Sequence, residues 1–116
     1  MSGKVSFLSG MAAEDGVAAA YERRGLCVAA RRWRGSRGEL DLVLRDGAGL
    51  VVVEVKQARD FERAAQRLTR AQLARIEGAA REFVAAEPAG QMTELRFDLA
   101  LVDGQGRIDI RENFWA

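Results

Sequence analysis

The stretch ELDLVLRDGAGLVVVEVK, residues 39–56, decides the fold because it joins two strand patterns through a turn. Residues 39–45 alternate in character, as a strand with one buried face does. Residues 50–56 are an apolar run of the kind found in fully buried strands. DGAG, residues 46–49, is a turn sequence that closes a hairpin as a two- or four-residue loop. The stretch therefore predicts a β-hairpin whose second strand is buried.

The charged side chains of this hairpin fall on one face. Because successive side chains of a strand point to opposite faces, Glu39, Asp41 and Val43 are expected on one face of the first strand. Glu54 and Lys56 are expected on the face opposite the alternate valines of the second. With a two- or four-residue loop, Asp41 lies directly across from Glu54, and a one-residue slip would push these charges into the apolar layer. The sequence predicts a cluster of Glu39, Asp41, Glu54 and Lys56.

Two facing carboxylates repel each other, so this cluster needs a compensating charge. A divalent cation held by Asp41 and Glu54 would supply it, and Lys56 would then reach the attacking water or the developing charge of the substrate. Glu14, on the inner stripe of a predicted first helix, is a candidate to complete the site. Such a centre beside arginines suits hydrolysis of a phosphodiester.

Simpler interpretations of the same residues stay open. Asp41 and Glu54 could be solvent-facing acids paired with arginines, and Lys56 could be only an ion-pair partner of Glu39 or Glu54. An acid such as Glu14 is also favoured near a helix N-terminus by the helix dipole.

Composition restricts the chemistry. The 116 residues predict a single domain, residues 1–116. Histidine is absent and there is one cysteine, which excludes serine–histidine triads, internal disulfides and cysteine-rich zinc sites. A metal would be held by oxygen ligands, which points to magnesium, manganese or calcium. The N-terminus is a poor signal peptide and no run is long enough to span a bilayer, so we expect a cytoplasmic protein without a membrane partner.

The rest of the chain predicts further helices and strands. Ser9 is a candidate cap for a helix that reaches about Arg24, and Thr69 for one that reaches about Ala86. Strands are expected at 26–34 and 94–102, with a short final strand at 107–110, whereas 60–67 reads as either helix or mobile loop. The order αβββαββ predicts an α/β domain with a mixed sheet.

Arginine supplies most of the positive charge, and Lys56 is the only lysine beyond Lys4. Arginines crowd around one aromatic residue before the hairpin. This group is a candidate to follow a phosphate backbone and stack on a base, and the alternative is an ordinary solvated face. Its members are Arg31, Arg32, Trp33, Arg34 and Arg37.

The string RGELDLVLRDGAGLVVVEVK, residues 37–56, resembles the GE-[IL]-D…VEVK block of the YraN-like bacterial proteins. These are similar to archaeal Holliday-junction resolvases and to PD-(D/E)XK, restriction-endonuclease-like nucleases. AED in the first helix, RRGL before the first strand and RFDLALVD near the end extend the resemblance over nearly the whole chain.

The resemblance implies a restriction-endonuclease-like αβββαβ core, with a mixed central sheet flanked by helices, that binds Mg²⁺ or, in its place, Mn²⁺. Asp41 matches the motif aspartate, and Glu54 and Lys56 match the ExK pair. Glu14 matches the glutamate of the first helix, and Glu39 that of the GE-[IL]-D string. The chain departs from the pattern at Gln72, where a lysine is common, and at residues 57–58.

The expected function is that of a magnesium-dependent endonuclease acting on DNA in repair or recombination. A branched junction as substrate would favour a homodimer with two sites. The alternative is a catalytically silent nuclease-fold module that binds nucleic acid or a protein partner.

Overall fold

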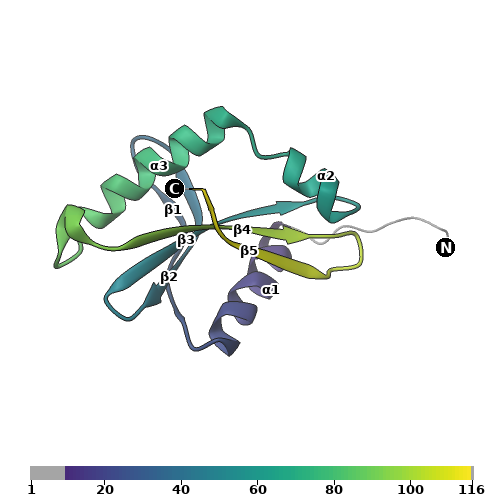
Figure 1. The fold of residues 1–116 in the computed structure, drawn as a ribbon, viewed down its shortest axis with the longest axis horizontal. Helices are drawn as coiled ribbons and strands as arrows, with labels where there is room; N and C mark the ends of the chain where they lie inside the picture. Colours follow the sequence, from purple (N-terminus) through teal and green to yellow (C-terminus); the bar gives the residue numbers. More distant parts are fainter. Residues whose placement is uncertain (1–9, 116) are drawn as a thin grey trace.

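The computed structural model describes residues 10–115, and Figure 1 shows their fold. The expected αβββαββ order is confirmed, with a short extra helix and a 3₁₀ turn added to it. The elements are α1 (Gly10–Arg23), β1 (Cys27–Arg34), β2 (Glu39–Asp46), β3 (Gly49–Gln57), α2 (Phe61–Gln66), α3 (Arg70–Val84), η1 (Gly90–Met92), β4 (Leu95–Val102) and β5 (Ile108–Trp115).

The five strands form one mixed sheet in the order β1-β2-β3-β4-β5. β3 and β4 are parallel, and every other neighbouring pair is antiparallel. In the β2–β3 hairpin Asp46 pairs with Gly49, so the turn has two residues, and Gly47 adopts a positive φ of 60°. The ladder continues to Leu42 opposite Val53, which confirms the predicted register.

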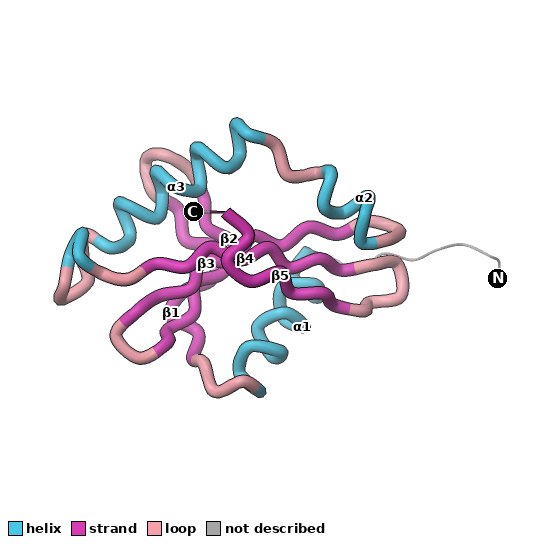
Figure 2. Tube along the Cα trace, viewed as in Figure 1, coloured by secondary structure: helices cyan, strands magenta, loops and turns pink. Residues whose placement is uncertain are grey.

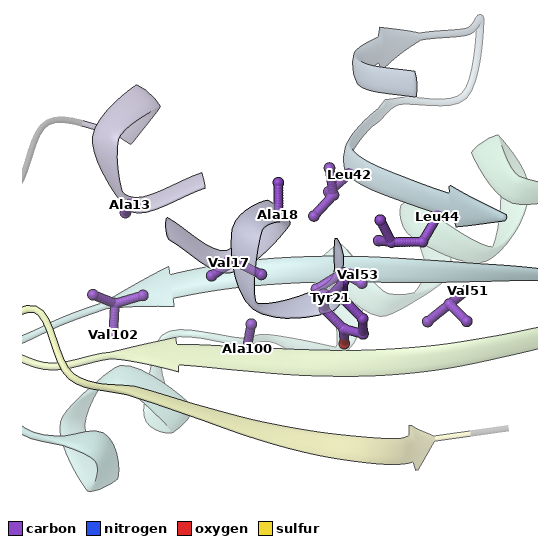
Figure 3. Close-up of a cluster of buried hydrophobic side chains, with 10 residues drawn as sticks. All are labelled: Ala13, Val17, Ala18, Tyr21, Leu42, Leu44, Val51, Val53, Ala100 and Val102. Atoms are coloured by element: carbon purple, nitrogen blue, oxygen red, sulfur yellow. The ribbon is translucent and has the colours of Figure 1, made fainter. Parts of the chain in front are cut away.

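Helices cover both faces of the sheet: α1 lies on one face, and α2 and α3 lie on the other (Figures 1 and 2). Figure 3 shows the core beneath α1, where buried side chains of the helix meet those of β2, β3 and β4. Two further apolar clusters fill the opposite face beneath α3 and α2. β3 and β4 thus lie between two apolar layers, as expected of parallel neighbours whose crossover contains helices.

The helix boundaries follow their capping residues. α1 ends just before Gly25, whose φ of 92° only glycine adopts readily, while its predicted cap Ser9 lies outside the described residues. The region at 60–67 is a helix, because the Asp60 side chain accepts a hydrogen bond from the backbone N–H of Arg63. Thr69 caps α3 as predicted, and the helix ends at Val84, two residues before the expected Ala86.

The last strand is longer than predicted: it spans Ile108–Trp115 rather than 107–110. A bulge opposite Phe97–Leu99 lets the charged stretch before Trp115 continue the strand. Within it Asn113 has a φ of 52°, and its backbone N–H donates to the buried Asp98 at 2.9 Å. Trp115 then stacks on Phe97 with ring centroids 5.3 Å apart, so it covers the edge of the core.

The prediction that side chains alternate strictly between the two faces along β2 was wrong. Leu42 and Leu44 pack beneath α1 as alternation requires, but Leu40 and Val43 both pack beneath α3. The side-chain direction therefore changes between Leu40 and Leu42, so Asp41 lies at a break in the pattern. Across residues 10–115, the helices are too short or too polar to span a lipid bilayer.

Candidate active site

The candidate site lies where β2 separates from β3. Their ladder stops at Leu42 opposite Val53, and one residue further along Asp41 bonds to β3 through its side chain. Its Oδ2 accepts a hydrogen bond from the backbone N–H of Val55 at 2.9 Å. The Asp41 carboxylate thus accepts the kind of hydrogen bond that a backbone carbonyl would accept in a continuous ladder. This bond holds the Asp41 side chain against β3.

The structure brings Glu54 to Asp41 as predicted. Glu54 is buried beside it, with an exposed fraction of 8%. Burial, then the charge of Asp41 and a hydrogen bond between the two side chains, raises the pKa of Glu54 to about 8, although Lys56 opposes the shift. At neutral pH Glu54 therefore keeps its proton, which relieves part of its repulsion with Asp41.

Lys56 completes this group on the same strand as Glu54. Its Nζ lies 3.1 Å from Oε2 of Glu54, and the two side chains are only 15% and 10% exposed. The contact between Lys56 and Glu54 that we considered as a simple alternative is therefore present, as a hydrogen bond from the ammonium group to a carboxyl group that keeps its proton at neutral pH. It also holds an ammonium group beside the carboxyl pair, where a compact cation would meet a bound anion.

Glu14 approaches the site from α1 and is held by an arginine. Its Oε1 accepts from Nε of Arg32 at 2.9 Å. Burial raises the pKa of Glu14 and the charge of Asp41 adds to the rise, while the bond to Arg32 lowers it. Arg32 adopts a positive φ of 48° and lies on β1 opposite the break in β2, between residues paired with Leu42 and Leu40. The sequence did not predict the pairing of Glu14 with Arg32, because arginine has no preference for the left-handed backbone conformation that Arg32 adopts.

Two further candidates have other partners. Glu39 is exposed and pairs with Arg34 at 3.3 Å. Gln72 forms a reciprocal capping box with Thr69 at the start of α3, with bonds of 3.0 and 3.1 Å. Within residues 10–115, no three or more His, Cys, Asp or Glu side chains gather into a group that could hold a metal ion. The site thus consists of Asp41, Glu54 and Lys56, with Glu14 beside them.

The predicted nucleic-acid group has three arginines on β1 that are paired within the protein, whereas Arg37 lies in the loop that follows β1. Arg31 pairs with Asp15, and Arg32 and Arg34 pair with the glutamates just described. Trp33 is half-buried and lies edge-on to Phe83, with ring centroids 5.2 Å apart.

The model of the family described as "Uncharacterised protein family UPF0102" matches residues 13–102, which include every residue of the candidate site. The chain belongs to the UPF0102 family. This confirms the YraN-like resemblance. A UPF0102 protein of Cereibacter sphaeroides strain ATCC 17025 is 56% identical over 116 residues, covering 100% of this chain and 99% of the relative. One from Ruegeria pomeroyi is 55% identical over 111 residues, covering 96% of this chain and 90% of the relative.

Glu54 should make this UPF0102 protein less stable at alkaline pH when no metal is present. The native state keeps a proton on Glu54 up to about pH 8, whereas the unfolded chain loses it near 4.5, so stability falls as pH rises through this window. Glu54→Gln removes the ionisation and should stabilise the protein by about 2 to 4 kcal/mol at alkaline pH relative to its effect at about pH 5. Urea unfolding in EDTA at the two pH values measures this, and an equal effect at both would contradict it.

Proposed function

We propose that this protein is a metal-dependent nuclease that hydrolyses phosphodiester bonds in DNA. The observation that carries the proposal is the contact of Asp41 and Glu54 beside Lys56, at the point where two core strands separate. An acid pair beside a lysine in a partly buried place is costly for folding, and such arrangements concentrate at functional sites. Membership of the UPF0102 family names no activity, so the proposal depends on the arrangement of these side chains.

The residues present fit a magnesium ion. Magnesium is commonly held by one or two carboxylates together with water and substrate phosphate, so Asp41 and Glu54 suffice as protein ligands. The two side chains are already in contact, and a cation would replace the proton that Glu54 keeps at neutral pH. When bound, the ion would neutralise the carboxylates and polarise the phosphate.

The chain's own residues supply the rest of the chemistry. Lys56 would donate hydrogen bonds to the water that attacks or to the charge that develops on the phosphate, since its ammonium lies 3.1 Å from Glu54. Glu14 would assist from α1, where its carboxylate accepts a hydrogen bond from Arg32 at 2.9 Å. The hydrogen bond from Val55 to Asp41 fixes the geometry of the centre.

The test is cleavage of a panel of labelled DNAs that includes duplexes, flaps, free ends and four-way junctions. The wild-type protein should cut at least one of them with Mg²⁺ or Mn²⁺ and none in EDTA. Asp41→Asn should be inactive on the same substrate, while Glu39→Gln, a nearby acid outside the carboxyl pair, should stay active. Cleavage by Asp41→Asn, or none by the wild-type protein, would contradict the proposal. A preference for junctions, together with a dimer in solution, would support a resolvase-like function.

A catalytically silent binding module is the second candidate. It is favoured by the contact between Lys56 and Glu54, because the ammonium group already occupies one side of Glu54, and by the finding that within residues 10–115 no third acidic side chain joins Asp41 and Glu54 in a group that could hold a metal ion. This alternative predicts DNA binding that Asp41→Asn leaves intact, no metal binding and no cleavage.

A further inference from the structure

Ion pairing separates the exposed arginines into two groups. Those on β1 are already matched by acids: Arg31 pairs with Asp15, and Arg32 and Arg34 pair with glutamates. A phosphate could bind any of them only by displacing a carboxylate. These arginines are therefore poorly placed to provide most of a DNA-binding surface.

The second group carries free charge. Seven exposed arginines have no carboxylate within 4.0 Å in the part of the chain that the structure describes: Arg23, Arg37, Arg59, Arg67, Arg70, Arg75 and Arg81. Four of these lie around the start of α3: Arg37, Arg67, Arg70 and Arg75. They come from the loop between β1 and β2, from the junction of α2 with α3, and from the first half of α3 (Figure 1). Residues 67–75 contain three arginines and no acid, so their charge is also uncompensated along the chain.

The β1–β2 loop is packed on α3, which brings these arginines toward the site. A Cβ on Gly38 would lie only 3.3 Å from Cβ of Arg75, and one on Gly78 would lie 3.1 Å from Cβ of Arg37. Glycine at both positions therefore permits the close approach. The loop enters β2 just before Asp41, so the arginines on α3 lie next to the strand that carries the site.

Glu82 fixes this arrangement from α3. Its carboxylate accepts hydrogen bonds from the backbone N–H groups of Ser36 and Arg37, at 3.1 and 2.9 Å, and from Oγ of Ser36 at 2.8 Å. Because two backbone N–H groups and the Ser36 hydroxyl satisfy the Glu82 carboxylate, the Arg37 guanidinium forms no ion pair with Glu82 within 4.0 Å. The loop is anchored while its cation stays available.

We propose that DNA docks by its phosphate backbone on Arg37, Arg67, Arg70 and Arg75, along the first half of α3, and passes from there to Asp41. The inference rests on the proposed function and deepens it by assigning the substrate surface. Unpaired guanidinium groups bind phosphate as a planar fork without first giving up a partner.

The test measures the affinity for a fluorescent DNA duplex in EDTA, so that no cleavage removes the probe, at about 50 to 200 mM salt. Arg67→Gln/Arg70→Gln/Arg75→Gln should weaken binding at least about tenfold at the lowest salt, and should make the slope of log affinity against log salt shallower by about 2 to 3. A matched triple variant removes the same charge from paired arginines elsewhere: Arg24→Gln/Arg45→Gln/Arg111→Gln. It should change the affinity by less than about threefold. Thermal unfolding verifies that both variants are folded.

A rival variant, Arg31→Gln/Arg34→Gln, separates the two surfaces. Equal or greater loss of affinity with this variant or with the matched triple than with the α3 triple would overturn the proposed surface and leave the nuclease proposal standing. No binding of the duplex by the wild-type protein would overturn the surface, and cleavage of the DNA panel would then decide the proposed function separately.

Discussion

Replacing Lys56 with methionine is expected to slow metal-dependent DNA cleavage by about 10²- to 10³-fold, the usual cost of removing one donor that stabilises charge in a transition state. The ammonium lies beside the carboxyl pair, 3.1 Å from Glu54, and the side chain is only 15% exposed. Methionine keeps much of the apolar stem and removes the charge. Single-turnover rates with excess enzyme measure the effect on the chemical step, and DNA affinity is measured in parallel.

The expected pattern is a lower rate with little change in affinity, since Lys56 acts on the reacting phosphate and lies apart from the proposed docking surface. Arg111→Met is the matched control because it also removes a cation from an ion pair, one that is exposed on β5. It should leave the rate within about twofold, as expected when an exposed pair contributes little. A cleavage rate that Lys56→Met leaves unchanged would remove Lys56 from the mechanism.

Replacing Asp98 with alanine is expected to lower the free energy of unfolding by about 3 to 5 kcal/mol, the cost of removing one partner of a buried charged network. Asp98 is fully buried. It accepts from the hydroxyl of Tyr21 at 2.6 Å, from Arg96 at 2.9 and 3.0 Å, and from the backbone of Asn113. Without it a buried hydroxyl, a half-buried guanidinium and the β5 bulge all lose their acceptor.

Urea unfolding of Asp98→Ala beside Asp109→Ala tests this assignment. Asp109 pairs with Arg111 on the same sheet edge, at 3.2 Å, but its side chain is 40% exposed. Its replacement should cost less than about 1 kcal/mol, as is usual for exposed pairs. Similar losses for the two variants would show that the network around Asp98 does not anchor β5 to α1.

The hairpin could be predicted from sequence because two local signals agree there. DGAG supplies a turn and the valine run supplies a buried strand, so the register and the contact of Asp41 with Glu54 follow from short-range patterns. The cap of α3 followed from Thr69 in the same way. Such features depend on residues that are close together in the chain, where turn residues, strand residues and capping residues all indicate the same structure.

Features that depend on distant contacts were not predictable in this way. β5 continues to Trp115 because Asp98 and Phe97 of another strand hold its charged second half. The change of direction around Asp41 coincides with the left-handed backbone of Arg32 on the neighbouring strand, and a strict period of two cannot show it. Which arginines stay unpaired also depends on tertiary ion pairs, so composition drew attention to β1 rather than to α3.

The central claim is that Asp41 and Glu54 hold a divalent cation, and titration calorimetry with Mn²⁺ tests it without knowledge of the substrate. Manganese is chosen because it binds such oxygen sites more tightly than magnesium. Glu39→Gln serves as the control, since Glu39 is a nearby acid that pairs with Arg34 outside the carboxyl pair. We predict that the wild-type protein and Glu39→Gln bind Mn²⁺ and that Asp41→Asn does not. No binding by the wild-type protein, or undiminished binding by Asp41→Asn, would contradict the account.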